Sequence, residues 1–450
     1  MGAFSGTSGG GKLLAIGDMH LGIRPSGVPE DLAGVEIEEL TPAAALQAAV
    51  KLAITERVDG VVFAGDLVEN MNARFEALQP LELALKELQE ARIGAWAVVG
   101  NHDADALPAL VRTSLNGLQL IGVGGKWESK LIESDGRPVA EICGWSFPSR
   151  HYKSSPLADL IVNPIAPHHA GLPRLGLLHG DLNGSGSYAP FKRTELDEIP
   201  LDGWLLGHVH IPSLGAASLS NGQPFGYLGS LVGLDSGEPG DRGPWLIHLD
   251  EDGSVRPEQQ VTAPLRWEEI EVPLAEDAST ETMGDALLDA TLSTAKALHE
   301  RGIEPRALGL RVKFTGRPHE QADLKRWADD EGQWSQIRRT VEKTEVFMRR
   351  VRTAFELPID LSLLAKGDDP AGLLARDLLL LQSDTPERES LLTAVRNDLS
   401  DEVGHSRWAE VRDHRSYEDP LLQDALVERL RRAGTRALGA LLLQREEAAV

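Results

Sequence analysis

Side chains that commonly bind metal ions stand at the ends of short apolar runs in this sequence. Eight of them follow five such runs: Asp18 and His20 in GDMH, Asp66 in GDLVEN, Asn101 and His102 in GNHD, His179 after RLGLL, and His208 and His210 in GHVH. Each run is rich in apolar or β-branched residues, which predicts a buried strand. Because the carboxyl ends of strands in an α/β sheet meet at one edge, these side chains are expected to share one cavity.

The chemistry of this set favours divalent metal ions. Residues two apart on an extended chain point the same way, so Asp18 can act with His20 and His208 with His210. Carboxylate, imidazole and amide ligands together suit Mn²⁺, Fe²⁺ or Zn²⁺. The one cysteine, Cys143, lies in the apolar run AEICGWSF and is expected to be a buried thiol, so a zinc site built from cysteines is excluded. A single pair of this kind has an ordinary explanation in the core or in solvent, whereas the full ordered series predicts a metal site.

Strand and helix patterns alternate through residues 12–262, which predicts an α/β domain. Between the first two apolar runs, Thr41 precedes a helix that opens with Pro42 and keeps apolar residues at helical spacing to Ile54. Thr is a favoured N-cap residue and Pro a favoured first helical residue, so a helix is expected to begin here.

The remaining segments predict a different organisation. Residues 263–356 mix three strand patterns with helical ones, which predicts a smaller α+β capping domain. Residues 357–450 show only helical periodicity, which predicts a helical region that could dock on a partner. Residues 1–11 lack any such pattern and are expected to form a flexible tail.

The composition limits the classes of partner. The chain carries 45 Lys and Arg against 69 Asp and Glu, a formal net charge of −24, so a DNA substrate would need a local basic track or a basic partner. The best local track is QIRRTVEKTEVFMRRVRT, from Gln336 to Thr353, although glutamates interrupt it. No apolar stretch approaches the roughly 18 residues of a membrane span, and the first residues lack the pattern of a secretory signal. We therefore expect a cytoplasmic protein with no membrane partner.

The ordered series DxH, GDxx(D/E), GNHD, H and GHxH resembles that of the calcineurin-like metallophosphoesterases over about residues 12–250. The resemblance implies a four-layer sandwich, in which two β-sheets are flanked by helices. It implies two divalent ions, one held by Asp18, His20 and His210, the other by Asn101, His179 and His208, with Asp66 bridging them. Between two such ions a water would lose its proton near neutral pH and attack phosphorus. His102 would then give a proton to the leaving oxygen, and Asp103 would orient His102.

Two longer stretches narrow the resemblance. The segments from Tyr188 to His210 and from Phe225 to Asp250 are similar to the SbcD nuclease subunit and, more closely, to the YhaO-like DNA repair exonucleases. That similarity implies a Mn²⁺-dependent DNA exonuclease or endonuclease that works with an SMC-like coiled-coil ATPase, with a homodimer also open. Glu69 departs from the pattern, because relatives more often carry Asp or His there.

Two alternatives stay open at this point. The shared motifs do not choose a substrate, so the chain could be a small-molecule or nucleotide phosphoesterase. It could also be a non-catalytic scaffold that keeps the metals for structure and holds an ATPase partner.

Overall fold

The computed structural model describes residues 10–70, 74–169, 171–184, 186–250, 252–355, 360–404 and 423–448. Most of the expected flexible tail, residues 1–9, lies outside the described residues. The chain divides into two compact units. One comprises Met1–Pro273, Ser279–Thr315 and Ala322–Ala354; the other comprises Leu274–Ala278, Gly316–Gln321 and Phe355–Val450. The expected boundaries at 262/263 and 356/357 stay a prediction, since the capping segment groups mainly with the first unit.

The first six-stranded sheet is built around four parallel strands. Its order is β12 (Val255–Gln259), β11 (Trp245–Leu249), β1 (Gly11–Ile16), β2 (Gly60–Phe63), β3 (Gly94–Ala97) and β4 (Leu118–Leu120). Strands β1 to β4 run parallel, whereas β11 pairs antiparallel with β1. The parallel arrangement brings the carboxyl ends of β1, β2 and β3 to one edge.

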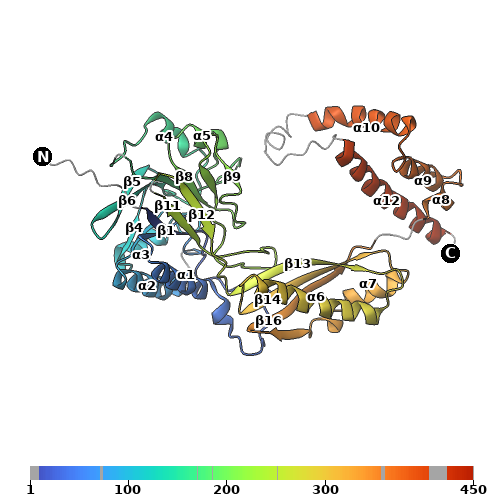
Figure 1. Ribbon diagram of the computed structural model, residues 1–450, viewed down its shortest axis with the longest axis horizontal. Coiled ribbons are helices and arrows are strands. Elements are labelled where there is room, and N and C mark those ends of the chain that lie inside the picture. Colours follow the sequence, from blue (N-terminus) through green and yellow to red (C-terminus); the bar gives the residue numbers. More distant parts are fainter. Residues whose placement is uncertain are drawn as a thin grey trace. The chain divides into compact units, whose positions relative to one another are not determined.

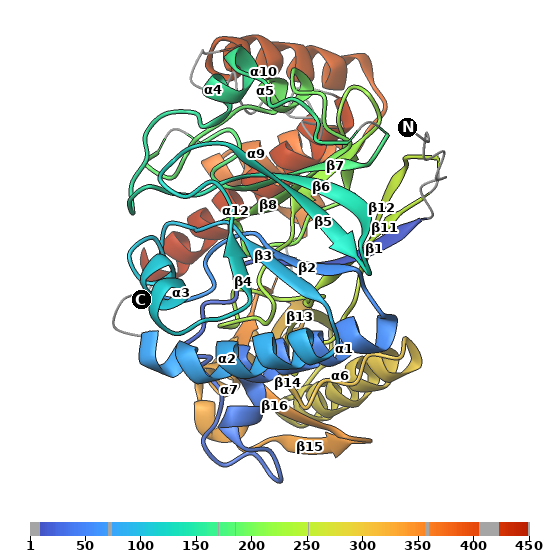
Figure 2. The ribbon, with the colours of Figure 1, turned by 90° about the vertical axis from the view of Figure 1, so that its left-hand side faces the viewer.

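The second six-stranded sheet supplies the other half of the sandwich. Its order is β5 (Glu128–Ser134), β6 (Arg137–Trp145), β7 (Arg174–His179), β8 (Gly203–Gly207), β10 (Pro224–Tyr227) and β9 (Ala217–Ser218). The two sheets face one another across a shared apolar core, to which β1 contributes Leu13 and Ala15 and the second sheet Ile142, Leu177 and Leu205 (Figure 2).

Helices cover both outer faces. The alternate residues of β1, Leu14 and Ile16, face a second core with α1 (Pro42–Glu56), α2 (Arg74–Glu90) and α3 (Leu107–Thr113). Figure 2 shows α1 and α2 side by side. The far face of the other sheet packs on α4 (Leu157–Val162) and α5 (Arg193–Asp197). The four-layer sandwich expected from the sequence is therefore confirmed.

Local sequence signals predicted some of these elements and failed to predict others. Thr41 caps α1 through its side chain, which accepts a hydrogen bond from the Ala44 N–H, and the helix begins at Pro42 as predicted. Cys143 is buried, also as predicted. In the two six-stranded sheets, the strands that no apolar run predicted are β5, β9 and β12, and all three lie at sheet edges, where one side of the strand meets solvent and tolerates polar residues.

The capping segment forms a four-stranded sheet with two helices on the same chain stretch. The sheet order is β13 (Leu265–Leu274), β14 (Ala307–Gly316), β16 (Thr344–Thr353) and β15 (Arg338–Val341), and the helices are α6 (Thr280–Glu300) and α7 (Gln321–Asp329). Trp267 and Phe347 meet edge to face in its core, with ring centres 5.5 Å apart. The capping segment also contains a short 3₁₀ helix, Glu331–Gln333. Another 3₁₀ helix, Ile37–Leu40, precedes α1.

The second unit is helical, as the sequence predicted. It contains α8 (Leu361–Leu364), α9 (Pro370–Leu380), α10 (Pro386–Gly404) and α12 (Gln423–Ala448), labelled in Figure 1. Buried leucines, including Leu378, Leu392, Leu426 and Leu438, form its core. Among the residues described, none of the helices combines the length and the apolar composition needed to cross a membrane.

Candidate metal centre

The five motifs converge at the carboxyl ends of five strands. Asp18 and His20 follow β1, Asp66 follows β2, Asn101 and His102 follow β3, His179 ends β7, and His208 and His210 follow β8. The structure therefore brings together residues from both sheets. Asp18, His20, Asp66 and His208 all have positive φ, at 22°, 49°, 51° and 107°, a conformation that costs free energy for residues with side chains. Such strain is typical of functional loops that the surrounding fold holds in place.

The first group is Asp18, His20 and His210. The Nε2 atoms of His20 and His210 lie 3.0 Å apart. Each ring uses its other nitrogen for a carboxylate: Nδ1 of His20 lies 2.6 Å from Glu69 and Nδ1 of His210 lies 2.5 Å from Glu238. With one proton on each ring, at Nδ1, the two Nε2 atoms present lone pairs to each other, and a metal ion bound by both would satisfy them.

Asp18 completes this group with an unused ligand atom. One of its oxygens accepts a hydrogen bond from the His208 N–H at 2.9 Å. The other, Oδ2, is buried and has no hydrogen-bond partner among the described residues. A buried carboxylate oxygen without a partner is costly, and a metal ion would remove that cost.

The second group forms around His179. Its Nδ1 lies 2.9 Å from the carbonyl oxygen of Ala64, to which it donates. Its Nε2 then faces two acceptors, Oδ1 of Asn101 at 3.0 Å and Oδ2 of Asp66 at 3.2 Å. The His208 ring lies beside it, with ring centres 5.3 Å apart. A nitrogen and two oxygens directed at one another form a donor set that suits a divalent ion.

Asp66 lies between the two groups. The same Oδ2 atom is 3.8 Å from Nε2 of His20 and 3.2 Å from Nε2 of His179. Its other oxygen accepts a hydrogen bond from the His102 N–H at 2.9 Å, which fixes the carboxylate. The position fits the bridging role expected from the sequence.

Burial and the charges of neighbouring groups shift the pKa values of side chains in the centre. Burial raises the pKa of Asp18. Burial lowers the pKa of His179, yet the adjacent Asp66 carboxylate raises it to about 9, so a proton is retained on this ring. Burial lowers the pKa of His208 to about 4, which keeps that imidazole neutral, as a ligand must be. Divalent ions would replace the retained proton and balance the carboxylates.

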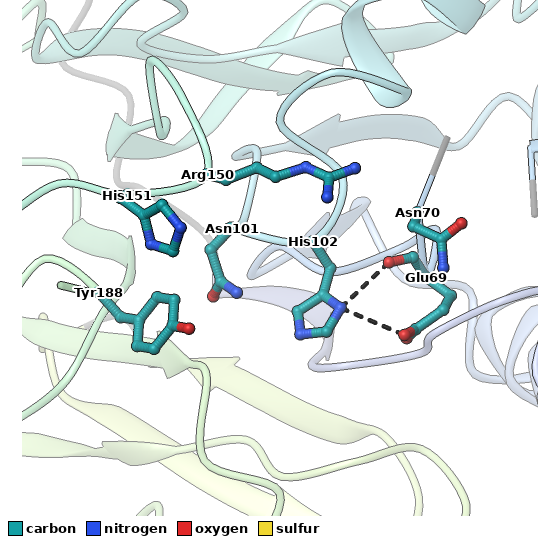
Figure 3. Close-up of a pocket in the computed structure, with 7 residues that line it drawn as sticks. All are labelled: Glu69, Asn70, Asn101, His102, Arg150, His151 and Tyr188. Atoms are coloured by element: carbon teal, nitrogen blue, oxygen red, sulfur yellow. Dashed lines mark hydrogen bonds and ion pairs between the residues drawn. The ribbon is translucent and has the colours of Figure 1, made fainter. Parts of the chain in front are cut away.

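Glu69, whose role could not be predicted from the sequence, contacts two of the motif histidines. Oε2 lies 2.6 Å from Nδ1 of His20. Oε1 lies 3.4 Å from Nδ1 of His102 (Figure 3). The His102 ring also donates to the Glu69 carbonyl oxygen at 3.1 Å. Hydrogen bonding to Glu69 raises the pKa of His102 to about 9. Burial raises the pKa of Glu69, but its bonds to His102 and His20 hold it at about 2.

Asp103 acts on the backbone instead of on the His102 ring. Its Oδ2 accepts a hydrogen bond from Leu67 N–H and its Oδ1 accepts one from Gly100 N–H, both at 2.7 Å. These two amides flank the loops that carry Asp66 and Asn101. The expectation that Asp103 orients His102 thus needs correction: Glu69 contacts the ring, and the fully buried Asp103 ties the two loops together.

Glu238 is a contributor that the sequence analysis did not name. It orients His210 through Nδ1, and it belongs to the acidic, glycine-rich turn within the stretch from Phe225 to Asp250. Nothing local in this stretch indicates which of its carboxylates reaches a histidine 28 residues away.

An open cavity of about 420 Å³ lies next to the centre. It is lined by Glu69, Asn70, Asn101, His102, Arg150, His151 and Tyr188 (Figure 3). The rings of His151 and Tyr188 lie 5.6 Å apart, and Tyr188 lies 5.3 Å from the His208 ring. The cavity therefore joins the metal-binding edge to a polar wall with aromatic surface.

Comparison with known proteins agrees with this geometry. Residues 11–212 match the family model described as calcineurin-like phosphoesterase, and they form a domain of that class. The chain is 28% identical over 248 residues to the metallophosphoesterase YhaO of Bacillus subtilis strain 168, covering 50% of this chain and 54% of that protein. The chain thus spans about half the length of this relative.

Solved structures show weaker likeness. A dimetal phosphatase from Danio rerio aligns with a TM-score of 0.35 at 15% identity, covering 56% of this chain and 98% of that one. The protein TT1561 of Thermus thermophilus aligns with a TM-score of 0.33 at 14% identity, covering 55% and 98%.

Proposed function

We propose that this chain is a two-metal phosphodiesterase that cuts DNA, as the nuclease subunit of an SbcCD-like repair complex. The observation that supports it is the pair of donor groups that share Asp66 and adjoin His102 and an open cavity. Asp18, His20 and His210 would hold one ion, and Asn101, His179 and His208 the other. When bound, the ions would activate water at neutral pH and stabilise charge on a phosphoryl group.

The chain's own residues would position and protonate the substrate. His102 is 41% exposed and meets the cavity, while its Nδ1 is held against Glu69. Figure 3 shows the other ring nitrogen, Nε2, directed away from Glu69. A proton held at Nε2 could pass to the leaving oxygen of a phosphodiester, and the raised pKa of His102 keeps that proton in place before the substrate arrives.

The cavity supports a substrate that contains a nucleobase. Tyr188 and His151 present aromatic faces on which a base can stack, an interaction worth about 1–3 kcal/mol per base. Arg150 stands on the same wall, paired with Asp105 at 3.0 Å. A volume of about 420 Å³ also lies within the range of sites for small molecules, so a nucleotide phosphoesterase remains the second candidate.

The acidic chain offers limited contact to a DNA backbone. Within the basic run expected to contact phosphate, Arg338 pairs with Asp31 at 2.8 Å and Arg352 pairs with Glu269. Arg349 and Arg350 are exposed on β16 and are the better candidates. Four proposals depend on the resemblance of the two long stretches. They are DNA as the substrate, Mn²⁺ as the metal, an SMC-like ATPase as the partner, and a homodimer.

A comparison of substrates tests the proposal. The purified chain, loaded with Mn²⁺, is offered linear DNA, a phosphodiester reporter and a phosphomonoester reporter. We expect turnover of DNA and the diester, with loss in an Asn101→Ala variant. Turnover confined to the monoester or to free nucleotides would overturn the nuclease proposal in favour of the second candidate. No turnover, together with capture of a coiled-coil ATPase, would favour the scaffold.

A further inference from the structure

The turn formed by residues 234–242 contacts both the metal centre and the capping sheet. We name it the acidic turn, since it carries Asp235, Glu238 and Asp241. We propose that the acidic turn is a coupling element, through which the capping sheet sets the position of the metal ligand His210. Asp241 and Arg242 are then positioning residues, and the inference rests on the metal binding of the proposed function.

One side of the turn fixes His210 at both ends. Oε1 of Glu238 lies 2.5 Å from Nδ1 of the ring, so the ring orientation depends on this carboxylate. The guanidinium of Arg242 donates to the His210 carbonyl oxygen, which also accepts a hydrogen bond from Ser230 N–H at 2.9 Å. Side chain and backbone of the ligand are therefore held by residues four apart on one turn.

The turn is itself rigid where it meets the ligand. The second oxygen of Glu238 accepts hydrogen bonds from the Ser230 hydroxyl and from Leu234 N–H, both at 3.0 Å. Arg242 is 1% exposed, and its guanidinium also donates to the Ser230 hydroxyl at 3.2 Å. A buried guanidinium and a carboxylate with several fixed partners do not reorient freely, so a shift of the turn would carry His210 with it.

The other side of the turn is fixed by the capping segment. Asp241, adjacent to Arg242 in sequence, pairs with Arg266 of β13 at 2.7 Å and with Arg301, which follows α6, at 3.0 Å. Gly240 N–H donates to the carbonyl oxygen of Trp267 at 2.9 Å, also on β13.

A second strand of the capping sheet, β14, also contacts the acidic turn. Arg311 donates to the carbonyl oxygen of Ser236 at 2.8 Å. The turn thus has contacts to β13, β14 and the end of α6, while its opposite side holds one metal ligand. Movement of the capping sheet, for example on binding a partner, would be transmitted to His210 without any contact between the partner and the metal centre.

The chain offers a matched pair of variants. Asp241→Asn removes the charge that two capping arginines contact. Glu39→Gln makes the equivalent change at a carboxylate that also contacts a capping arginine, Arg306, at 2.9 Å, but lies outside the acidic turn. Both changes are isosteric and both act on surface-accessible acceptors, so a general loosening of the capping segment would affect them alike.

The test measures Mn²⁺ binding to the full chain by isothermal titration calorimetry, with thermal unfolding to confirm folding. We expect Asp241→Asn to lower the affinity for one of the two bound ions about 10-fold and to leave the affinity for the other unchanged. A loss of about 10-fold is the lower end of the range for residues that hold a metal ligand in place without binding the metal. Glu39→Gln should stay within about 2-fold of wild type, as for an exposed ion pair. Glu238→Gln should weaken the same ion, and the double variant with Asp241→Asn should add little, because both changes act through His210.

Each outcome separates the two claims. Wild-type chain that binds no Mn²⁺ would overturn the proposed function and this inference together. Two bound ions in wild type, with equal affinities in Asp241→Asn and Glu39→Gln, would overturn the coupling alone. If Asp241→Asn fails to fold, hydrogen exchange of residues 234–242 in Arg301→Ala against Arg306→Ala decides: faster exchange only in Arg301→Ala supports the coupling, and equal exchange overturns it.

Discussion

The loops that carry Asp66 and Asn101 approach each other closely at Gly100, so a substitution there tests how this contact positions Asp66. A Cβ placed there would lie 2.1 Å from Oδ1 of Asp66 and 2.6 Å from its backbone nitrogen. Ordinary van der Waals contact begins at 3.4 Å, so Gly100→Ala demands a displacement of more than 1 Å. The expected effect comes from this close approach and not from backbone strain, because the φ of Gly100 is not in the left-handed region.

The Asp66 carboxylate cannot rotate away without loss. One oxygen accepts from His102 N–H at 2.9 Å and the other lies 3.2 Å from Nε2 of His179. The backbone nitrogen cannot be relieved by a side-chain rotation at all. Overpacking of this kind costs about 1–3 kcal/mol in the free energy of unfolding. A displacement of about 1 Å in an active site can lower turnover about 100-fold.

We therefore expect Gly100→Ala to lower the melting temperature by several degrees, to weaken Mn²⁺ binding and to reduce diester turnover at least about 100-fold. Calorimetric titration, thermal unfolding and the reporter assay measure the three effects on one preparation. Gly284→Ala is the matched control: its Cβ would meet only Trp327 at 3.8 Å, and Ala is preferred over Gly inside a helix by about 1 kcal/mol. Wild-type metal affinity and turnover in Gly100→Ala would refute the argument that these loops determine the position of Asp66.

Three further outcomes follow from the same geometry. His102→Ala should keep its Mn²⁺ affinity and lose about 10²–10⁴-fold in turnover, since His102 acts as a proton donor and not as a ligand; parallel loss of metal would count against that role. Asp103→Ala should lower the free energy of unfolding by about 2 kcal/mol or more, because it leaves the buried N–H groups of Leu67 and Gly100 without an acceptor; a denaturation midpoint equal to that of wild type would contradict this. Chelation with EDTA should abolish turnover and added Mn²⁺ should restore it, whereas turnover that survives exhaustive chelation would exclude the two-metal proposal.

The sequence predicted which residues form the candidate metal centre, because the relevant signals are local. Apolar runs predicted β1, β2, β3, β7 and β8, and the polar side chains of the motifs follow each run directly in the sequence. Within each sheet the carboxyl ends of neighbouring parallel strands lie at one edge, which gathers the residues that follow β1, β2 and β3 and, separately, those that follow β7 and β8. The packing of the two sheets brings these two sets together. Thr41 and Pro42 likewise set the start of α1 through groups adjacent in sequence.

Only the tertiary structure decided the residues that hold the ligands. Glu69 reaches His20 across 49 positions, Glu238 reaches His210 across 28, and Asp103 reaches the amide of Leu67 across 36. A carboxylate gives no local sign of its partner, because its hydrogen bonds depend on which distant loop the fold places within about 3 Å.

The same reason explains why the charge of the basic run could not be read from sequence. Arg338 is paired by Asp31, 307 positions earlier in the chain, and Arg352 by Glu269, 83 positions away. The identity of the candidate ligands is thus a property of short segments, whereas their orientation and the surface charge arise from contacts between segments that only folding brings together.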